Sequence, residues 1–166
     1  MKNIYLIGMM NCGKSTCARL LHCSLGRPML DTDQEIEARA GMSIQQIFRQ
    51  YGEPYFRDLE TALCQELSRQ ENLIIACGGG LPLRQENRDL LRQSGKVVFL
   101  NRDPQRCYEE GDMSQRPLAQ QGKADFLSRY FQREPIYRAA AHLIIGDYPS
   151  PEQTVNEILQ QLEEQQ

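Results

Sequence analysis

Five short apolar runs recur along the chain, separated by stretches in which apolar residues follow a helical spacing. The runs cover residues 3–7, 28–31, 73–77, 96–100 and 142–146. Short runs of this kind, bounded by glycine or polar residues, are typical of buried strands in a parallel sheet. Strands that alternate with helices predict an α/β fold of three layers, in which helices cover both faces of a five-stranded parallel sheet.

The segments between the runs carry helix signals at their ends. Ser43 and Gln46 have the capping-box spacing, Gly95 follows a helical stretch, and Ser150 precedes a proline in the way expected of an N-cap. Residues 109–123 instead lose all periodicity and contain two glycines and a proline, which predicts a loop of lid length. The expected helices cover residues 16–21, 43–48, a stretch after Gly52, 82–94, 125–141 and 151–162.

Length and charge limit the classes of function that fit the chain. Its 166 residues match one domain, and the 19 basic and 22 acidic residues give a net charge of −3, which excludes a general attraction to nucleic acid or an anionic membrane. No apolar run approaches the roughly 20 residues of a membrane span, and no signal-peptide pattern precedes the first strand. The six cysteines form no Cys-x-x-Cys pair and the two histidines lie far apart, so we expect reduced thiols, no zinc site and a cytoplasmic protein.

A glycine-rich segment between the first strand and the first helix carries the clearest chemical signal. Residues 8–15 read Gly-Met-Met-Asn-Cys-Gly-Lys-Ser, the spacing of a phosphate-binding loop. Gly8 and Gly13 allow backbone amides to point at phosphate oxygens, Lys14 adds positive charge for the β- and γ-phosphates, and Ser15 offers a hydroxyl to Mg²⁺. The expected ATP-binding residues are Asn11, Cys12, Gly13, Lys14, Ser15 and Thr16.

Two carboxylates follow the second strand. Asp31 and Asp33 lie where the strand ends, and in a parallel sheet this edge also holds the phosphate loop, so one can serve Mg²⁺ through water while the other reaches a substrate. The alternative is purely local, with Asp31 in a turn and Asp33 as the N-cap of a helix over residues 34–40. We favour the functional interpretation, because an N-cap role leaves the carboxylates available.

Three consecutive glycines, Gly78, Gly79 and Gly80, follow the most apolar strand. They cost conformational entropy and pack nothing, so we expect another group to approach their backbone closely. A flexible turn is the alternative. Further on, Arg57 and Glu60 lie three residues apart beside an apolar helical stripe, where local physics favours a surface ion pair worth about 0.3 kcal/mol.

The ordered set of these motifs resembles the shikimate kinase family over nearly the whole chain. The resemblance implies strand order 2-3-1-4-5, a fold similar to nucleoside monophosphate kinases, and transfer of the ATP γ-phosphate to the 3-hydroxyl of shikimate. The motifs that carry it are Gly8-x4-Gly13-Lys14-Ser15-Thr16, Asp31-Thr32-Asp33-x2-Ile36-Glu37, Gly52-Glu53-x2-Phe56-Arg57-x2-Glu60, Gly78-Gly79-Gly80, Arg116-Pro117-Leu118 and Arg133-x3-Tyr137.

The resemblance also implies roles for single residues within one domain over 1–166. Lys14, Asp33 and Arg116 are the expected catalytic residues, with Arg116 reaching the phosphates from the lid at 109–123. Shikimate would be bound by Asp33, Arg57, Gly78, Gly79, Gly80 and Arg133, with a substrate-binding helical region at about 33–61. Ser15 and Asp31 would hold the metal, Mg²⁺. The expected partners are ATP and shikimate, and we expect a monomer.

The chain departs from the family pattern around the adenine. The family commonly has an arginine seven residues before the lid arginine, and here that position is Glu109; Arg106 is a candidate substitute. Residues 147–149, after the last strand, contain no basic residue. Other acceptors stay open, namely gluconate or a nucleoside monophosphate, although no aromatic-lined base pocket is evident. A regulatory ATP-binding module without catalysis is the alternative from another class.

Overall fold

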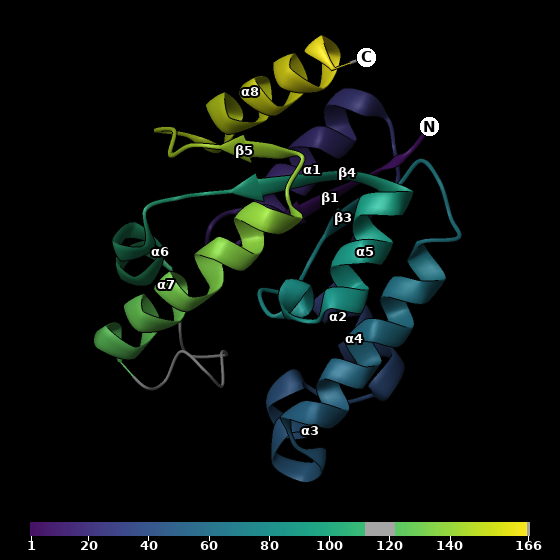
Figure 1. Ribbon diagram of the computed structural model, residues 1–166, viewed down its shortest axis with the longest axis vertical. Helices are drawn as coiled ribbons and strands as arrows, with labels where there is room; N and C mark the ends of the chain where they lie inside the picture. The colour runs from purple at the N-terminus through teal and green to yellow at the C-terminus, as the bar shows by residue number, and fades with distance from the viewer. Residues whose placement is uncertain (112–121, 166) are drawn as a thin grey trace.

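Five parallel strands form the central sheet in a computed structural model that describes residues 1–111 and 122–165 (Figure 1). The strand order is β2-β3-β1-β4-β5, as the resemblance implies. The apolar runs and the strands agree to within two residues at each end. The strands are β1 (Asn3–Ile7), β2 (Met29–Asp31), β3 (Ile74–Ala76), β4 (Gly95–Leu100) and β5 (Leu143–Ile145).

Helices cover both faces of the sheet, which confirms the three-layer prediction. α1 packs against α8 on one face, while α4, α5 and α7 follow one another on the other face (Figure 1). α3 packs on α4 at the end of the molecule away from α8. The helices are α1 (Lys14–Leu25), α2 (Thr32–Ala40), α3 (Ile44–Tyr51), α4 (Glu53–Leu67), α5 (Gln85–Ser94), α6 (Pro104–Glu110), α7 (Lys123–Ala140) and α8 (Pro151–Glu164), with a 3-10 turn, η1 (Leu81–Leu83), before α5.

The largest differences from the predicted elements are a new helix and a later start of α5. The helix α6 was not predicted; its N-cap Asp103 accepts a hydrogen bond from the Gln105 amide, so the expected loop at 109–123 begins with two helical residues. Pro82 lies in η1, and α5 starts only at Gln85. Residues 112–121, which include Arg116 and most of the predicted lid, lie outside the described residues.

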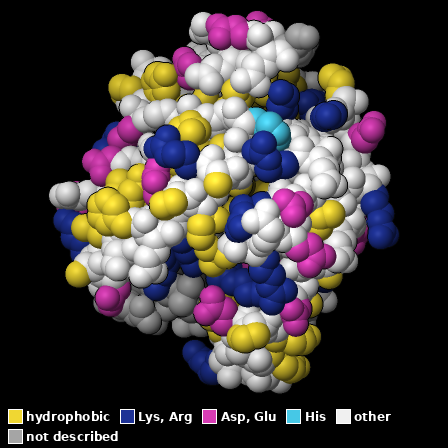
Figure 2. Space-filling model, in the orientation of Figure 1, with side chains coloured by type: hydrophobic (Ala, Val, Ile, Leu, Met, Phe, Trp, Pro, Cys, Tyr) yellow, Lys and Arg dark blue, Asp and Glu magenta, His cyan; other side chains and the backbone are white. Residues whose placement is uncertain are grey.

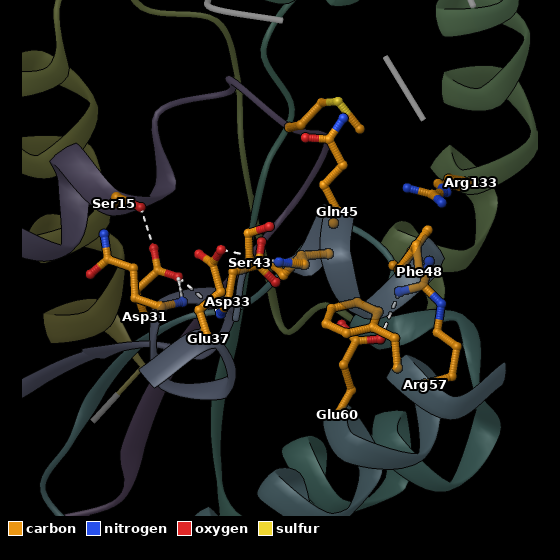
Figure 3. A pocket seen from close by; sticks show the side chains of 16 residues that line it. Ser15, Asp31, Asp33, Glu37, Ser43, Gln45, Phe48, Arg57, Glu60 and Arg133 are labelled. Carbon is orange, nitrogen blue, oxygen red and sulfur yellow. Dashed lines mark hydrogen bonds and ion pairs between the residues drawn. The ribbon is translucent and has the colours of Figure 1, made fainter. Parts of the chain in front are cut away.

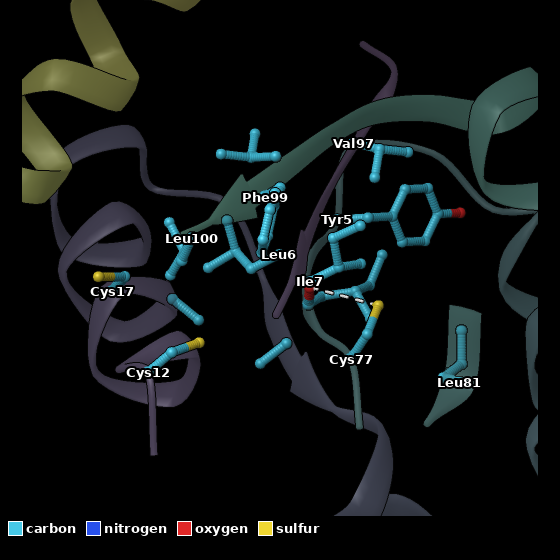
Figure 4. Close-up of a cluster of buried hydrophobic side chains, with 14 of the residues drawn as sticks. Tyr5, Leu6, Ile7, Cys12, Cys17, Cys77, Leu81, Val97, Phe99 and Leu100 are labelled. Atoms are coloured by element: carbon cyan, nitrogen blue, oxygen red, sulfur yellow. Dashed lines mark hydrogen bonds between the residues drawn. The ribbon is translucent and has the colours of Figure 1, made fainter. Parts of the chain in front are cut away.

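The core follows directly from the apolar runs. In β1, Tyr5, Leu6 and Ile7 are fully buried, and β3 and β4 flank them with further buried side chains (Figure 4). Tyr5 keeps its hydroxyl satisfied through Ser94 Oγ at 2.7 Å. Because β1, β2 and β3 are parallel neighbours, their carboxyl ends bring the phosphate loop, Asp31 and the three glycines to the same edge.

The face of the molecule seen in Figure 2 has no single dominant charge. Acidic and basic side chains are interspersed over the face seen in Figure 2. Within the described residues, no helix has both the length and the apolar composition needed to cross a membrane. All six cysteines are free thiols.

Candidate active site

The phosphate loop joins β1 to α1 in a conformation that favours glycine at two positions. Gly8 and Gly13 have φ of 147° and 94°, and a Cβ on Gly8 would lie 2.8 Å from the Leu100 carbonyl. The α1 helix starts at Lys14, whose Nζ donates to the carbonyls of Gly8 at 2.9 Å and Met9 at 2.7 Å. A helix N-terminus and a lysine therefore converge on one loop, which is a natural anion site.

A cavity of about 360 Å³ lies against this loop. Arg116, which the resemblance also assigns to ATP, lies outside the described residues. Five of the other six predicted ATP-binding residues line the cavity, namely Asn11, Gly13, Lys14, Ser15 and Thr16. Cys12 lies elsewhere: its side chain faces a smaller neighbouring cavity, and its backbone N–H donates to the Met9 carbonyl at 3.3 Å.

Ser15 and Asp31 meet at the edge of this cavity. Ser15 Oγ donates to Asp31 Oδ2 at 2.5 Å (Figure 3). Asp31 Oδ1 accepts from the amides of Asp33 and Gln34, so the N-cap of α2 is Asp31, and the alternative that made Asp33 the cap is wrong. A hydroxyl and a carboxylate are the hard oxygen donors that fit Mg²⁺.

Protein ligands for that ion are few. Among the described residues no group of three or more histidine, cysteine, aspartate or glutamate side chains could hold a metal. Mg²⁺ commonly keeps several waters and takes one or two carboxylates together with phosphate oxygens.

A second cavity, of about 350 Å³, adjoins the first. Asp33 from α2, Arg57 and Glu60 from α4, and Arg133 from α7 all face it (Figure 3). Predicted substrate residues that are far apart in the sequence therefore come together. The two cavities share Ser15, Asp31, Asp33 and Gly79 in their walls.

The three glycines allow this convergence. A Cβ on Gly78 would clash with Asp33 Oδ1, and a Cβ on Gly80 would clash with the Arg57 guanidinium. A Cβ on Gly79 would lie 3.6 Å from Arg133 Nη1. The predicted close approach to this backbone is confirmed, and the approaching groups are the side chains of the second cavity.

Arg57 and Glu60 form the predicted ion pair, but not on the surface. Arg57 Nη1 lies 2.6 Å from Glu60 Oε1, and the two side chains are 11% and 1% exposed. The second oxygen, Glu60 Oε2, is buried and has no hydrogen-bond partner among the residues that the structure describes. Burial raises the pKa of Glu60 to about 7, with a further contribution from Asp33, despite the opposing attraction of Arg57. The expectation of a weak surface pair is therefore wrong.

Arg133 is held on α7 beneath the glycine segment. It is 6% exposed, and Tyr137, one turn later, donates from its hydroxyl to the Gly79 carbonyl at 2.6 Å. Burial raises the pKa of Tyr137 to about 12, so the hydroxyl keeps its proton for this bond. α7 thus fixes both the arginine and the glycine backbone.

Sequence reasoning missed much of the lining of the second cavity. Phe48 and Phe56 both line the cavity, with ring centroids 5.3 Å apart, and Phe56 is at the same time buried in the core. Two aromatic rings therefore border the cavity of the two arginines, although no aromatic-lined pocket was evident in the sequence. The capping box at Ser43 was the only local signal that this region is ordered. Further lining residues are Met10, Gln34, Glu37, Ser43, Ile44 and Gln45.

A P-loop on a five-stranded parallel sheet, with an adjoining cavity that carries two arginines and an aspartate, defines a P-loop kinase of small molecules. The family model of shikimate kinase matches residues 10–163. The chain belongs to the shikimate kinase family.

Individual relatives agree with this assignment. A shikimate kinase of Burkholderia thailandensis is 42% identical over 97% of this chain and 90% of its own. A structure of the Acinetobacter baumannii shikimate kinase in complex with shikimate has a TM-score of 0.90 at 36% identity, covering 100% of this chain and 95% of that one. A gluconokinase from Sinorhizobium meliloti, at 15% identity, a TM-score of 0.56 and coverage of 99% and 97%, shares the fold alone.

Proposed function

We propose that this protein transfers the γ-phosphate of ATP to the 3-hydroxyl of shikimate. The observation that carries the proposal is the shared wall of the two cavities, made of Ser15, Asp31, Asp33 and Gly79. Phosphates bound at the loop and an acceptor bound in the second cavity would meet there. Positioning of this kind supplies most of the catalysis in phosphoryl transfer.

The charges of the second cavity suit a small hydroxylated carboxylate. Arg57 and Arg133 offer planar guanidinium groups, which bind a carboxylate with two parallel hydrogen bonds. Asp33 lies across the cavity, where it can accept hydrogen bonds from ring hydroxyls. Phe48 and Phe56 supply apolar walls for a carbon ring.

Asp33 is also placed to take part in the chemistry. Its carboxylate would accept the proton of the reacting hydroxyl as the oxygen attacks the γ-phosphorus and the bond to the ADP oxygen breaks. Lys14 would stabilise the charge on the phosphates, and Arg116 remains a predicted contributor from the lid. Ser15 and Asp31 would hold Mg²⁺, which when bound supplies positive charge against the β- and γ-phosphates.

The alternatives lack specific support. A catalytically silent ATP-binding module has no need of an acceptor cavity, yet Asp33, Arg57 and Arg133 converge on one. For gluconate the likeness is one of fold alone. We also propose a cytoplasmic location, in keeping with six free thiols, and a monomeric state.

A coupled assay of ADP formation tests the proposal. Shikimate, gluconate and AMP are offered separately with MgATP, and the product is identified by mass and by ³¹P NMR. We expect shikimate to give the highest kcat/KM and a 3-phosphate ester. A higher kcat/KM with gluconate or AMP, or no turnover with any acceptor, contradicts the proposal.

A further inference from the structure

Gln45 is a neutral polar residue of the second cavity, the acceptor cavity of the proposed reaction, and that reaction gives it no role. It lies on α3 and lines the cavity together with Asp33, Arg57 and Arg133. In the view of Figure 3, the Gln45 side chain stands away from α3, between Asp33 and Arg133. The residue is half-buried, and its amide makes no hydrogen bond within residues 1–111 and 122–165. The amide therefore offers the cavity both donors and an acceptor.

The other neutral polar side chains on this wall are less available to a ligand. Ser15 Oγ donates to a carboxylate at 2.5 Å, and Ser43 Oγ accepts a backbone amide at 3.1 Å as the N-cap of α3. Gln34 is exposed to solvent. Gln45 is thus the neutral side chain best placed to bind a polar group inside the cavity.

The backbone that carries Gln45 is held in place by its neighbours. The capping box at Ser43 closes the start of α3, and Glu37 Oε2 on α2 accepts from the Ile44 amide at 3.1 Å. Ile47, two residues after Gln45, is fully buried. A fixed backbone limits the freedom that is lost when a ligand binds, which favours affinity.

The hydroxyls of the proposed acceptor need more than one partner. Shikimate carries hydroxyls at carbons 3, 4 and 5, and Asp33 is expected at the hydroxyl that reacts. A hydroxyl enclosed in a cavity without a partner gives up its hydrogen bonds to water at a cost in free energy. An amide that both donates and accepts fits a hydroxyl, which does the same.

We propose that the Gln45 amide binds one of the two shikimate hydroxyls that do not react, at carbon 4 or carbon 5, and so contributes to acceptor specificity. The inference rests on the proposed function, since it takes shikimate to occupy the acceptor cavity. A site that hydrogen-bonds a substrate hydroxyl discriminates against an analogue without it, because the protein group then loses its partner. Gln45 would thus distinguish shikimate from one of its deoxy analogues.

Two substitutions serve as controls for Gln45→Ala. Gln45→Met keeps the length of the side chain but removes the amide, so it separates hydrogen bonding from the filling of space. Gln50→Ala removes the same type of side chain from an exposed position of the same helix, and Gln50 is not part of the wall of the acceptor cavity.

The test removes the two partners of the proposed hydrogen bond separately and together. Calorimetry measures binding of shikimate, 4-deoxyshikimate and 5-deoxyshikimate to the wild type, Gln45→Ala, Gln45→Met and Gln50→Ala. Gln45→Ala and Gln45→Met should each weaken shikimate about three- to tenfold, the range of one neutral hydrogen bond. For one of the two deoxy analogues this loss should vanish, because the wild type makes no such bond to it either. Gln50→Ala should bind all three ligands as the wild type does, and MgATP affinity should be unchanged in every variant.

Other outcomes overturn the inference. Wild-type affinity for shikimate in Gln45→Ala would make Gln45 a solvated side chain. Wild-type affinity in Gln45→Met alone would show that the residue only fills space, and equal losses for all three ligands would show that it binds neither hydroxyl. A wild type that binds no shikimate would refute the proposed function itself. Circular dichroism melts of each variant identify any loss that comes from unfolding.

Discussion

At the scale of single residues, Asp33 carries the proton transfer of the proposed reaction. It lines both large cavities and approaches the Gly78 backbone so closely that only glycine fits there. Asp33→Asn keeps the shape of the side chain but cannot accept the hydroxyl proton. We expect the rate of phosphoryl transfer to fall at least about a hundredfold, with a much smaller change in shikimate affinity. Rapid-quench kinetics measures the rate of phosphoryl transfer, and calorimetry measures the shikimate affinity. A wild-type rate of phosphoryl transfer in Asp33→Asn would leave Asp33 with a binding role only.

The two arginines of the acceptor cavity make the second prediction at this scale. Arg57→Lys or Arg133→Lys should weaken shikimate binding by about 2 kcal/mol or more, because an ammonium cannot reproduce a bidentate contact. ATP binding should stay close to wild type. Arg39→Lys is the matched control, since Arg39 also pairs with two glutamates, Glu35 and Glu66, but on the exposed face of α2. A loss of affinity for ATP alone, or an equal loss of shikimate affinity in Arg39→Lys, would refute the placement of Arg57 and Arg133 at the shikimate carboxylate.

At the scale of elements, the segment between β3 and η1 decides whether the arginine of α4 can reach the cavity. Gly80 has φ of −93°, which any residue adopts, and the nearest atoms that a side chain there would meet belong to the Arg57 guanidinium. Gly80→Ala should displace Arg57 and weaken shikimate binding about tenfold or more, by the cost of disturbing one buried charged contact. Equilibrium dialysis with shikimate alone measures the effect.

Gly146→Ala is the control for that substitution. A Cβ on Gly146 would meet no atom of the described residues within 4 Å, and its φ is outside the positive range. Shikimate affinity should therefore be unchanged in Gly146→Ala. Wild-type affinity in Gly80→Ala would mean that Arg57 can move aside and still bind.

At the scale of the whole molecule, the buried Glu60 links stability to pH. Its pKa is raised to about 7 from an ordinary value of 4.5, so between these values the folded state binds more protons than the unfolded state. The free energy of unfolding therefore falls as pH rises through this window, by up to about 3 kcal/mol. Glu60→Gln removes the titration and should lose less stability between pH 4.5 and 7 than the wild type.

Urea denaturation of both proteins at several pH values measures this difference. The other carboxylates titrate in both proteins and cancel in the comparison. A stability difference between wild type and Glu60→Gln that does not change with pH would mean that Glu60 stays ionised across the window, held so by Arg57.

The sequence by itself determined the features whose causes are local. The five strands follow from apolar runs, and the phosphate loop follows from glycines whose backbone conformations other residues rarely adopt. The capping box at Ser43 and the N-cap at Ser150 were predicted correctly, since both depend on residues three positions apart. The short helix α6 was not predicted, because its seven residues are too few to show a helical spacing of apolar positions.

Only the tertiary structure decided which distant side chains share a cavity. Whether Arg57 and Glu60 form a surface pair or a buried one depends on η1, which packs against α4, and on α7, which packs against η1; both lie far along the chain. The identity of the groups that approach Gly78, Gly79 and Gly80 likewise depends on three helices meeting at one strand end. The strand order was predicted only from the resemblance to the family. β3 lies between β2 and β1 in the sheet, and no local sequence pattern indicates this order. Local sequence fixes backbone conformation, whereas burial and charge environment arise only when separate elements pack together.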